Sequence, residues 1–230
     1  MSMPFYVPPE QLTKDRAEFA RKGIARGRPI VVLEYHDGVL LMGENPSGSL
    51  HKTSEIYDKV AFAGVGRFNE FEMLRVAGIR YADLKGYSYE RDDVTAKGLA
   101  NAYAQTLGQI FTHEMKPYEI EVMIAEIGNN PTETKIYRIQ FDGTLRDVRR
   151  FGAMGAMEEE LDERLGEGTD ELPALAGAIG LAADTIEAIL ETTIADEDWE
   201  AAVLDRNLGR RKFRRLESSE IGELRGGDAT

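Results

Sequence analysis

The amino-acid sequence predicts an α+β fold in which antiparallel sheets are covered by helices arranged in pairs. Three observations lead to this prediction. Strand-like segments follow one another in runs, helix-like segments do the same, and two Asp-Gly turns lie between strand-like segments. The order along the 230 residues is one helix, three strands, two helices, three strands, two helices and two strands. Strict alternation of strands and helices, which would indicate a doubly wound parallel sheet, is not seen, so we expect a layered sandwich.

A first helix is expected over residues 9–22, after a short segment, residues 1–8, that contains several apolar side chains. Pro9 suits the first turn of a helix because the N–H group that proline lacks is not needed there. Leu12 and Phe19 share one face of this helix, while its charged side chains point elsewhere. The first segment lacks the basic start and long apolar run of a signal peptide.

A hairpin comes next, with strands over residues 30–35 and 39–42 joined by the Asp37-Gly38 turn. A loop rich in Pro, Ser and Gly over residues 44–49 leads towards a short strand over residues 60–64. These segments form the first run of strands.

Two long helices are expected after this run, one over residues 67–84 and one that begins after Asp92-Asp93 and ends before Pro117. The aspartate pair is expected to cap the second helix. Gly64-Val65-Gly66 precedes the first helix and predicts a tight turn from strand to helix. A dinucleotide-binding loop is the alternative, but Asn69 stands where that pattern needs its third glycine.

The second half of the chain is similar in its order of elements. Three strands, two helices and two final strands are expected over residues 119–127, 136–141, 151–154, 157–165, 173–193, 199–204 and 212–216. The remaining segment, residues 217–230, is polar and has little to bury, so we expect a flexible C-terminal tail.

Composition excludes several classes of function. The net charge of −13 argues against nucleic-acid binding, and the basic run over residues 206–215 is expected to be a solvated edge strand paired with carboxylates. The chain has no cysteine, which excludes disulfides and thiolate metal sites and suits the cytoplasm. No apolar run is long enough to cross a membrane.

No local pattern predicts a metal, a cofactor or a catalytic nucleophile. The three histidines, His36, His51 and His113, are never spaced as a helix-borne zinc pair. The acidic residues 196–198 lack the ligand spacing and the turn glycine of a calcium loop, so a solvated helix end is expected. No Gly-x-Ser-x-Gly motif is present.

Several longer stretches are specific when taken together. They are residues 18–27 running into 37–41, residues 44–52 with 54–60, and residues 66–72, 100–108 and 200–216. On these stretches the chain, from about Pro4 to Leu224, resembles the α-type subunits of actinobacterial proteasomes. The resemblance implies a four-layer αββα sandwich of the N-terminal-nucleophile hydrolase type, over residues 9–216, with an extra N-terminal helix matched by residues 9–22.

The resemblance also implies a function without catalysis. Family α subunits form seven-membered rings that flank rings of catalytic β subunits. They gate the entry of protein substrates into this threonine-type endopeptidase, and they dock an ATPase ring through its C-terminal tails. Partners would therefore be other copies of this chain, β subunits, the activator and substrates in transit, with no nucleic acid, membrane or cofactor.

The residues agree that this chain does not itself cut peptides. Enzymes of this fold use a Thr, Ser or Cys at the start of a mature strand as both nucleophile and base. Removal of the first methionine would expose Ser2, but prolines and a helix follow it, so Ser2 cannot open a buried strand. Cleavage before Thr144 would discard over half of the fold, and cleavage before Thr169 would expose a helix start.

The resemblance assigns an activator pocket around Lys52. In the family, a lysine at this place lies between neighbouring α subunits and pairs with the C-terminal carboxylate of an activator tail. Gly27, Gly64 and Val65 correspond to the backbone and wall of that pocket. Without the resemblance, Lys52 would be interpreted as an ordinary surface lysine.

Two further sites are implied. The first is a gate, in which apolar side chains of residues 1–8 converge at the ring axis before a bend. Its expected members are Met3, Phe5, Tyr6, Val7, Pro8 and Pro9. The alternative is a disordered N-terminus. The second is a ring interface on the first helix, where Glu18 and Arg21 would pack against the next protomer.

Other functions stay open at this point. A catalytic N-terminal-nucleophile hydrolase would need processing that creates a nucleophile at the start of a strand. A stand-alone ring scaffold would lack any β partner. A nucleotide-binding enzyme is disfavoured by Asn69.

Overall fold

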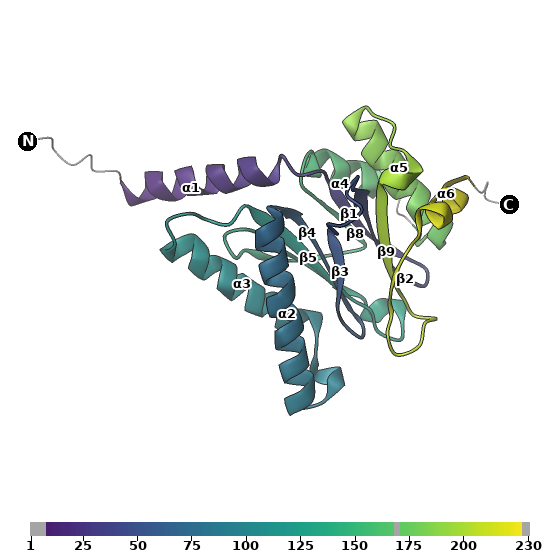
Figure 1. The fold of residues 1–230 in the computed structure, drawn as a ribbon, viewed down its shortest axis with the longest axis horizontal. Helices are drawn as coiled ribbons and strands as arrows, with labels where there is room; N and C mark the ends of the chain where they lie inside the picture. The colour runs from purple at the N-terminus through teal and green to yellow at the C-terminus, as the bar shows by residue number, and fades with distance from the viewer. Residues whose placement is uncertain (1–7, 168–170, 227–230) are drawn as a thin grey trace, which may run out of the picture.

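The centre of the molecule consists of two stacked antiparallel sheets (Figure 1). The computed structural model describes residues 8–167 and 171–226, and within them ten strands form two five-stranded sheets. The first sheet has the order β10 (Phe213–Arg215), β9 (Trp199–Asp205), β2 (Gly38–Glu44), β1 (Ile30–Tyr35) and β8 (Phe151–Met154). The second has the order β3 (Thr53–Tyr57), β4 (Val60–Gly66), β5 (Ile120–Glu126), β6 (Lys135–Ile139) and β7 (Leu145–Val148).

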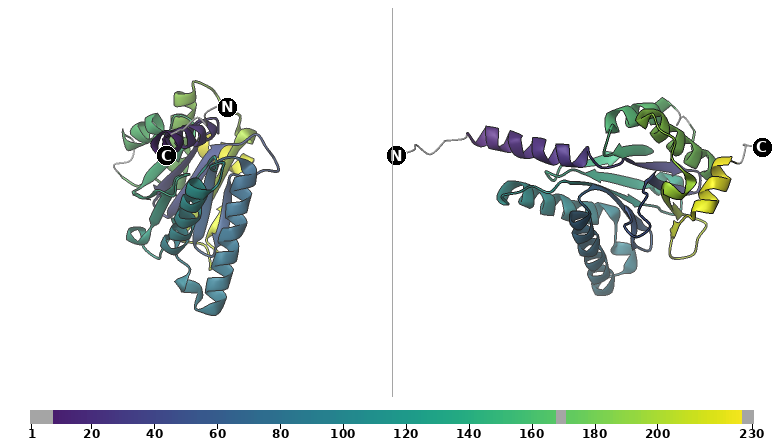
Figure 2. Two further views of the ribbon diagram at one scale, coloured as in Figure 1. Left: turned by 90° about the vertical axis from the view of Figure 1, so that its left-hand side faces the viewer. Right: turned by 45° about the horizontal axis from the view of Figure 1, so that its top comes forward.

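Helices cover the outer face of each sheet (Figures 1 and 2). The α-helices of the described residues are α1 (Pro9–Ile24), α2 (Phe68–Ser88), α3 (Ala96–His113), α4 (Glu158–Glu167), α5 (Leu175–Leu190) and α6 (Ser218–Gly226). Helices α2 and α3 contact the second sheet, and α4, α5 and α6 contact the first. The four-layer αββα sandwich with an extra N-terminal helix is therefore confirmed.

Apolar side chains alternate between the two faces of the first sheet, which explains why this chain needs a second sheet as well as helices to cover them. In β1, Val31 and Leu33 pack into the cluster beneath α5, while Ile30 and Val32 pack into the cluster between the sheets. Successive side chains of a strand point to opposite faces, so both faces of β1 must be covered. A third apolar cluster lies between the second sheet and helices α2 and α3.

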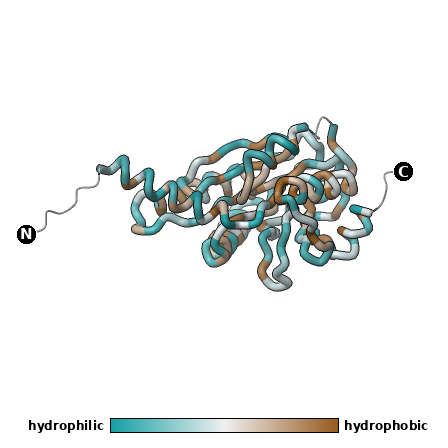
Figure 3. The backbone as a smooth tube through the Cα atoms, turned by 90° about the horizontal axis from the view of Figure 1, so that it is seen from above, coloured by the Kyte–Doolittle hydropathy of each residue, from teal (hydrophilic) through white to brown (hydrophobic). Residues whose placement is uncertain are grey.

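Helix α1 extends from the body of the sandwich instead of lying flat on it (Figure 1). Figure 3 shows that it is mostly hydrophilic along its length, and only Ala20 and Ile24 are buried. Ala20 and Ile24 pack into the cluster between the sheets, and arginine adds to this contact: the Arg16 guanidinium lies 5.6 Å from the centre of the Phe111 ring and donates to the carbonyl of Glu114 at the end of α3.

Most predicted elements are confirmed, but β3, β7 and α6 were missed. Strands β3 and β7 are edge strands that keep polar side chains on their open faces, so neither has a continuous apolar run. The prediction of a flexible tail is wrong for α6. There Ile221 is buried, and Arg225 bonds Glu187 and Asp196.

Two local predictions need correction. The N-cap of α3 is Thr95, whose hydroxyl accepts from Gly98 N at 3.2 Å, and Asp92-Asp93 lie in a short 3-10 helix before it. Gly64-Val65-Gly66 is the end of β4, paired with β5, and is not a turn. Only its last residue has the backbone of a turn, with φ +134°.

The charged runs have partners within the chain. As predicted, the basic run includes the edge strand β10, and its arginines pair with carboxylates, such as Arg211 with Glu55 and Arg214 with Glu220. In the part of the chain that the structure describes, no group of three or more His, Asp or Glu side chains is arranged to hold a metal ion. No described helix is both long and apolar enough to cross a membrane.

Candidate functional site

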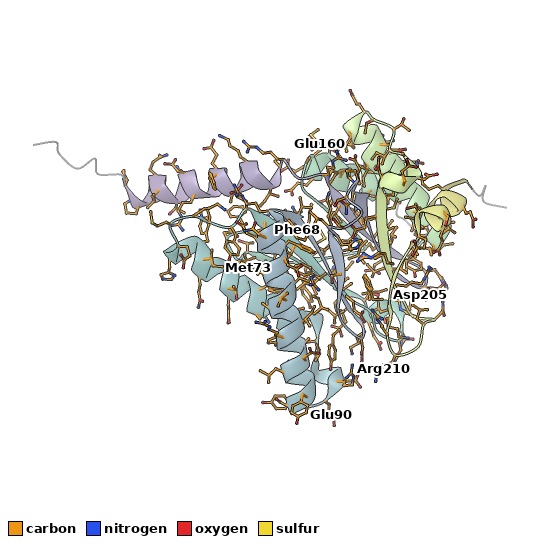
Figure 4. All side chains as sticks on the ribbon, viewed as in Figure 1. Phe68, Met73, Glu90, Glu160, Asp205 and Arg210 are labelled. Atoms are coloured by element: carbon orange, nitrogen blue, oxygen red, sulfur yellow. The ribbon has the colours of Figure 1, made fainter. Side chains whose placement is uncertain are left out.

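A pocket of about 280 Å³ lies where the chain entering β1, the loop after β2 and the end of β4 meet. Gly27, Lys52, Gly64 and Val65, which the resemblance assigned to one site, all line it. Phe68, labelled in Figure 4 at the N-terminal end of α2, lines the pocket as well. Segments far apart in the sequence therefore meet around one lysine.

The Lys52 ammonium group is held by main-chain oxygens. Its Nζ donates to the carbonyl of Arg28 at 3.2 Å and to the carbonyl of Glu44 at 3.0 Å. These bonds use two of the three donors of an ammonium group, and the third has no acceptor among the described residues. The neighbouring Arg28 guanidinium is paired with the Glu44 carboxylate, so Lys52 is the less engaged of the two cations.

The environment of Lys52 lowers the pKa of its ammonium group. Burial lowers the pKa of Lys52 to about 8, because a charge loses solvation in a partly enclosed site. The Glu200 carboxylate opposes this shift, the Arg28 guanidinium adds to it, and the Glu44 carboxylate opposes it. At neutral pH the group is therefore mostly charged and poorly hydrated, which is a favourable state for binding an anion.

Two glycines allow the segments that form the walls of the pocket to pack closely against each other. A Cβ atom on Gly27 would lie 2.3 Å from Cγ1 of Val65, and one on Gly64 would lie 2.7 Å from the Phe71 ring. Gly64 N also donates to the Lys52 carbonyl at 3.1 Å, which joins β4 to the residue before β3. Larger residues would separate the two segments that form the pocket.

The floor of the site contains a residue that sequence reasoning missed. Glu200 on β9 is buried, and its carboxylate accepts from the main-chain N–H groups of Lys52 and Thr53. The one signal in the sequence was a carboxylate between Trp199 and Ala201, ahead of the apolar residues 201–204 of the same strand. Nothing in its spacing linked it to Lys52, because 148 residues separate the two.

The expected gate falls mainly outside the described residues. Met3, Phe5, Tyr6 and Val7 lie there. Pro8 and Pro9 are described: Pro8 precedes α1 with extended backbone, φ −57° and ψ 141°, and Pro9 is the first residue of the helix. The Pro8 carbonyl accepts from the N–H groups of Gln11 and Leu12, which are the first hydrogen bonds of α1.

The two expected ring-interface residues lie on the surface of α1. Glu18 pairs with Lys22 at 2.6 Å, and this exposed pair holds the pKa of the Glu18 carboxyl below its usual range. The Arg21 guanidinium lies 5.6 Å from the centre of the Phe141 ring of the same chain. Both side chains remain accessible to a neighbouring molecule.

The start of β1 does not have the features of an N-terminal-nucleophile site. The strand begins at Ile30, after Arg28 and Pro29, and helix α1 precedes it in the chain. Enzymes of this fold need a Thr, Ser or Cys with a free amino group there.

Comparisons with known proteins agree with this arrangement. The proteasome subunit family matches residues 24–204. The protein named proteasome subunit alpha of Xylanimonas cellulosilytica is 55% identical over 236 residues, covering 98% of this chain and 97% of that protein. Those of Thermomonospora curvata and Kineococcus radiotolerans are 56% and 53% identical, covering 97% and 99% of this chain and 98% and 99% of their own length. The chain belongs to the proteasome subunit family, and within it to the α subunits.

Proposed function

We propose that this chain forms seven-membered outer rings of a proteasome core, gates substrate entry to rings of β subunits and docks an ATPase activator. Proteasome α subunits are the non-catalytic class of subunit in this threonine protease complex, and the chain is such a subunit. The observation that supports docking best is the Lys52 pocket. The proposal places the complex in the cytoplasm, which suits a chain without cysteine.

The pocket suits a C-terminal carboxylate for electrostatic and geometric reasons. The ammonium is already fixed by two carbonyl oxygens, so little side-chain entropy is lost when a ligand binds. Its poor hydration strengthens the attraction to an anion. The volume of about 280 Å³ is near the lower end of ligand pockets, which run from about 300 Å³, and suits the last residue of a peptide tail.

Helix α1 supports the ring and the gate. Leu12 and Phe19 expose 52% and 46% of their surface, and their spacing of seven residues places them on one face of the helix. Together with Glu18 and Arg21 they offer a surface for the next protomer of a closed ring. The segment before Pro8 would then be delivered towards the ring axis.

The first test is the mass and composition of the native complex. Purified from its own cells, the chain should be found in a particle of about 28 subunits, four rings of seven, with one smaller partner. A monomer or a partner-free dimer would contradict the assembly. A particle without β subunits would favour the stand-alone scaffold, and a processed N-terminal nucleophile on this chain would favour the hydrolase.

The second test concerns the pocket. Lys52→Ala should reduce activator-driven degradation of a folded substrate by roughly tenfold or more, because the charge that binds the tail is lost. Assembly and the hydrolysis of small peptides should be unchanged. Lys135→Ala, which removes an exposed lysine that does not line the pocket, is the matched control and should behave as the wild type. Equal activity of both variants would rule out the docking role of Lys52.

A further inference from the structure

Glu200 has more hydrogen-bond donors around it than one carboxylate in a strand requires. Its Oε1 accepts from Lys52 N at 3.1 Å, Thr53 N at 2.9 Å and the Thr53 hydroxyl at 2.5 Å. Its Oε2 accepts from Lys52 N at 3.0 Å and from the Asn45 side-chain amide at 2.5 Å. Residues 45–53, which form one side of the pocket, are thus held to Glu200 at both ends.

The position of this carboxylate is costly, which argues for a specific role. Only 7% of Glu200 is exposed, and it faces Gly43 of β2 across the sheet. A buried charge destabilises a fold unless its hydrogen bonds are satisfied. The donors that satisfy it belong to the pocket loop, and Arg215, 3.5 Å from Oε1, supplies the nearest guanidinium.

Two further bonds of the loop involve groups that also bond Glu200. The Asn45 amide also donates to the Leu50 carbonyl at 2.6 Å, and Arg215 Nη2 donates to the Thr53 carbonyl at 3.0 Å. Both of these groups bond Glu200 as well. If the carboxylate were absent, Asn45, Thr53 and Arg215 would lose their common partner, and the main chain at Lys52 would lose its acceptor.

From these contacts we propose that Glu200 is the positioning residue of the Lys52 pocket: it fixes the loop that carries Lys52 and leaves the ammonium group without a direct carboxylate partner. This inference rests on the proposed docking function. Glu200 bonds the main chain of Lys52, and no bond joins its carboxylate to Nζ among the described residues. The ammonium group therefore remains available to a ligand, and the negative charge of the Glu200 carboxylate still acts on it.

The charges around Lys52 come from several elements. Glu200 on β9 and Glu44 at the end of β2 favour the charged lysine, and Arg28 before β1 disfavours it. His51 lies next to it in sequence, with Nδ1 3.8 Å from Glu200, and Arg215 on β10 bonds the same carboxylate. Of the charges that favour the ammonium, Glu200 has the larger effect, since the Glu44 carboxylate is paired with Arg28.

The test uses the assembled particle and measures Lys52 directly. Brief labelling with acetic anhydride over a range of pH, followed by peptide mass spectrometry, reports the pH at which the Lys52 amine becomes reactive. Glu200→Gln keeps the size of the side chain but removes its charge. We expect the Lys52 profile to shift to lower pH in this variant, because the carboxylate that favours the ammonium is gone.

Glu187→Gln is the matched control. Glu187 is also mostly buried, accepts from a main-chain N–H group and pairs with an arginine, but it lies on α5 and does not line the pocket. This control should leave the Lys52 profile unchanged. Glu200→Asp keeps the negative charge on a shorter side chain, so its Lys52 profile should lie closer to the wild-type profile than that of Glu200→Gln. This variant replaces Glu200→Gln in the test if the glutamine variant does not fold.

A binding measurement separates this inference from the docking proposal. A short peptide with a free C-terminal carboxylate should bind Glu200→Gln roughly tenfold more weakly than wild type, and its amidated form should bind neither. If the peptide binds neither wild type nor Lys52→Ala, the docking proposal is wrong. The labelling profile of Lys52 still tests the role of Glu200 in that case. An unchanged labelling profile in folded Glu200→Gln would overturn the positioning role.

Discussion

The Lys52 side chain is fixed in place and only partly hydrated, and this combination decides what it can bind. The carbonyl oxygens of Arg28 and Glu44 fix the ammonium group without neutralising it. Burial lowers the pKa of Lys52 to about 8, so the charge is present at neutral pH and is lost not far above it. A charge in such a site interacts with a carboxylate more strongly than one in open water.

We therefore expect the affinity for a peptide with a free C-terminal carboxylate to fall as pH rises from about 7 to about 9. The form that binds is the ammonium, which is populated below the pKa of about 8 and lost above it. A bound carboxylate itself favours the ammonium, so the measured midpoint should lie above that of the empty pocket. Fluorescence anisotropy at constant ionic strength would give the curve.

Lys52→Arg provides the control for this pH dependence. A guanidinium stays charged over the whole range, so the affinity of this variant should not change with pH. It should also be weaker than wild type at pH 7, because the planar group cannot reproduce the contacts of a compact ammonium with two carbonyls. A wild-type curve as flat as that of the variant would show that Lys52 does not titrate in the pocket.

At the scale of elements, the junction between β4 and α2 depends on one backbone conformation. Gly66 ends β4 with φ +134°, and a Cβ atom there would lie 1.9 Å from the Glu119 carbonyl oxygen. The next residue, Arg67, donates its N–H to that same oxygen at 3.0 Å. The chain can therefore turn from the strand into α2 only where the side chain is absent.

Gly66→Ala should lower the free energy of unfolding by about 2–4 kcal/mol, from backbone strain together with the steric overlap. Gly180→Ala is the control, because Gly180 lies in α5 with no atom within 4 Å of the added Cβ. That change should stabilise the helix by about 0.5–1 kcal/mol. Urea unfolding at one protein concentration measures both, and similar values for the two variants would contradict the argument.

The sequence predicted those elements whose apolar pattern is local. Strands β1 and β2 flank the predicted turn, which lies at His36-Asp37, one residue earlier than the expected Asp37-Gly38. Strands β5 and β9 are mostly apolar, so all four strands were expected close to their observed bounds. Strand β3 was missed because its sequence, Thr-Ser-Glu-Ile-Tyr, is half polar and it is an edge strand. Its strand conformation comes from pairing with β4, which is a tertiary effect.

The pocket was even harder to predict from local sequence than β3 was. Gly27, Lys52, Gly64 and Val65 could be assigned only through resemblance, since no local spacing marks a site formed by separate segments. Glu200 could not be found in this way. Its role depends on the register of β9 against β2, and a shift of one residue would point its side chain to the other face of the sheet.

At the scale of the whole molecule, one arginine connects three of the four layers. Arg138 on β6 is 8% exposed and pairs with Glu121 on β5 and with Glu158 and Asp162 on α4. Asp162 also accepts from Ala153 N of β8 at 2.7 Å. The network therefore joins the second sheet, the first sheet and the helix layer outside it.

Replacing this arginine should destabilise the whole sandwich. Arg138→Met leaves Glu121, which is 3% exposed, without its cation, and breaking a buried pair in this way costs about 3–5 kcal/mol. Arg211→Met, which breaks the exposed pair with Glu55, is the control and should lower the stability far less, because solvent screens an exposed pair. Urea unfolding of the full chain at one protein concentration would compare the two.

The pH dependence of this loss distinguishes a charge effect from a packing effect. Burial raises the pKa of Glu158 and of Asp162, and Arg138 opposes both shifts, so in Arg138→Met these carboxyls should take up protons at higher pH than in wild type. When the pKa of a carboxyl is higher in the folded state than in the unfolded state, the folded state binds more protons. The free energy of unfolding therefore rises as pH falls through the folded pKa. The deficit of the variant should therefore be largest at neutral pH and shrink towards about pH 4.5, near the ordinary carboxyl values. A deficit that stays constant with pH would mean that Arg138 acts through its packing alone, and that its charge does not hold the layers together.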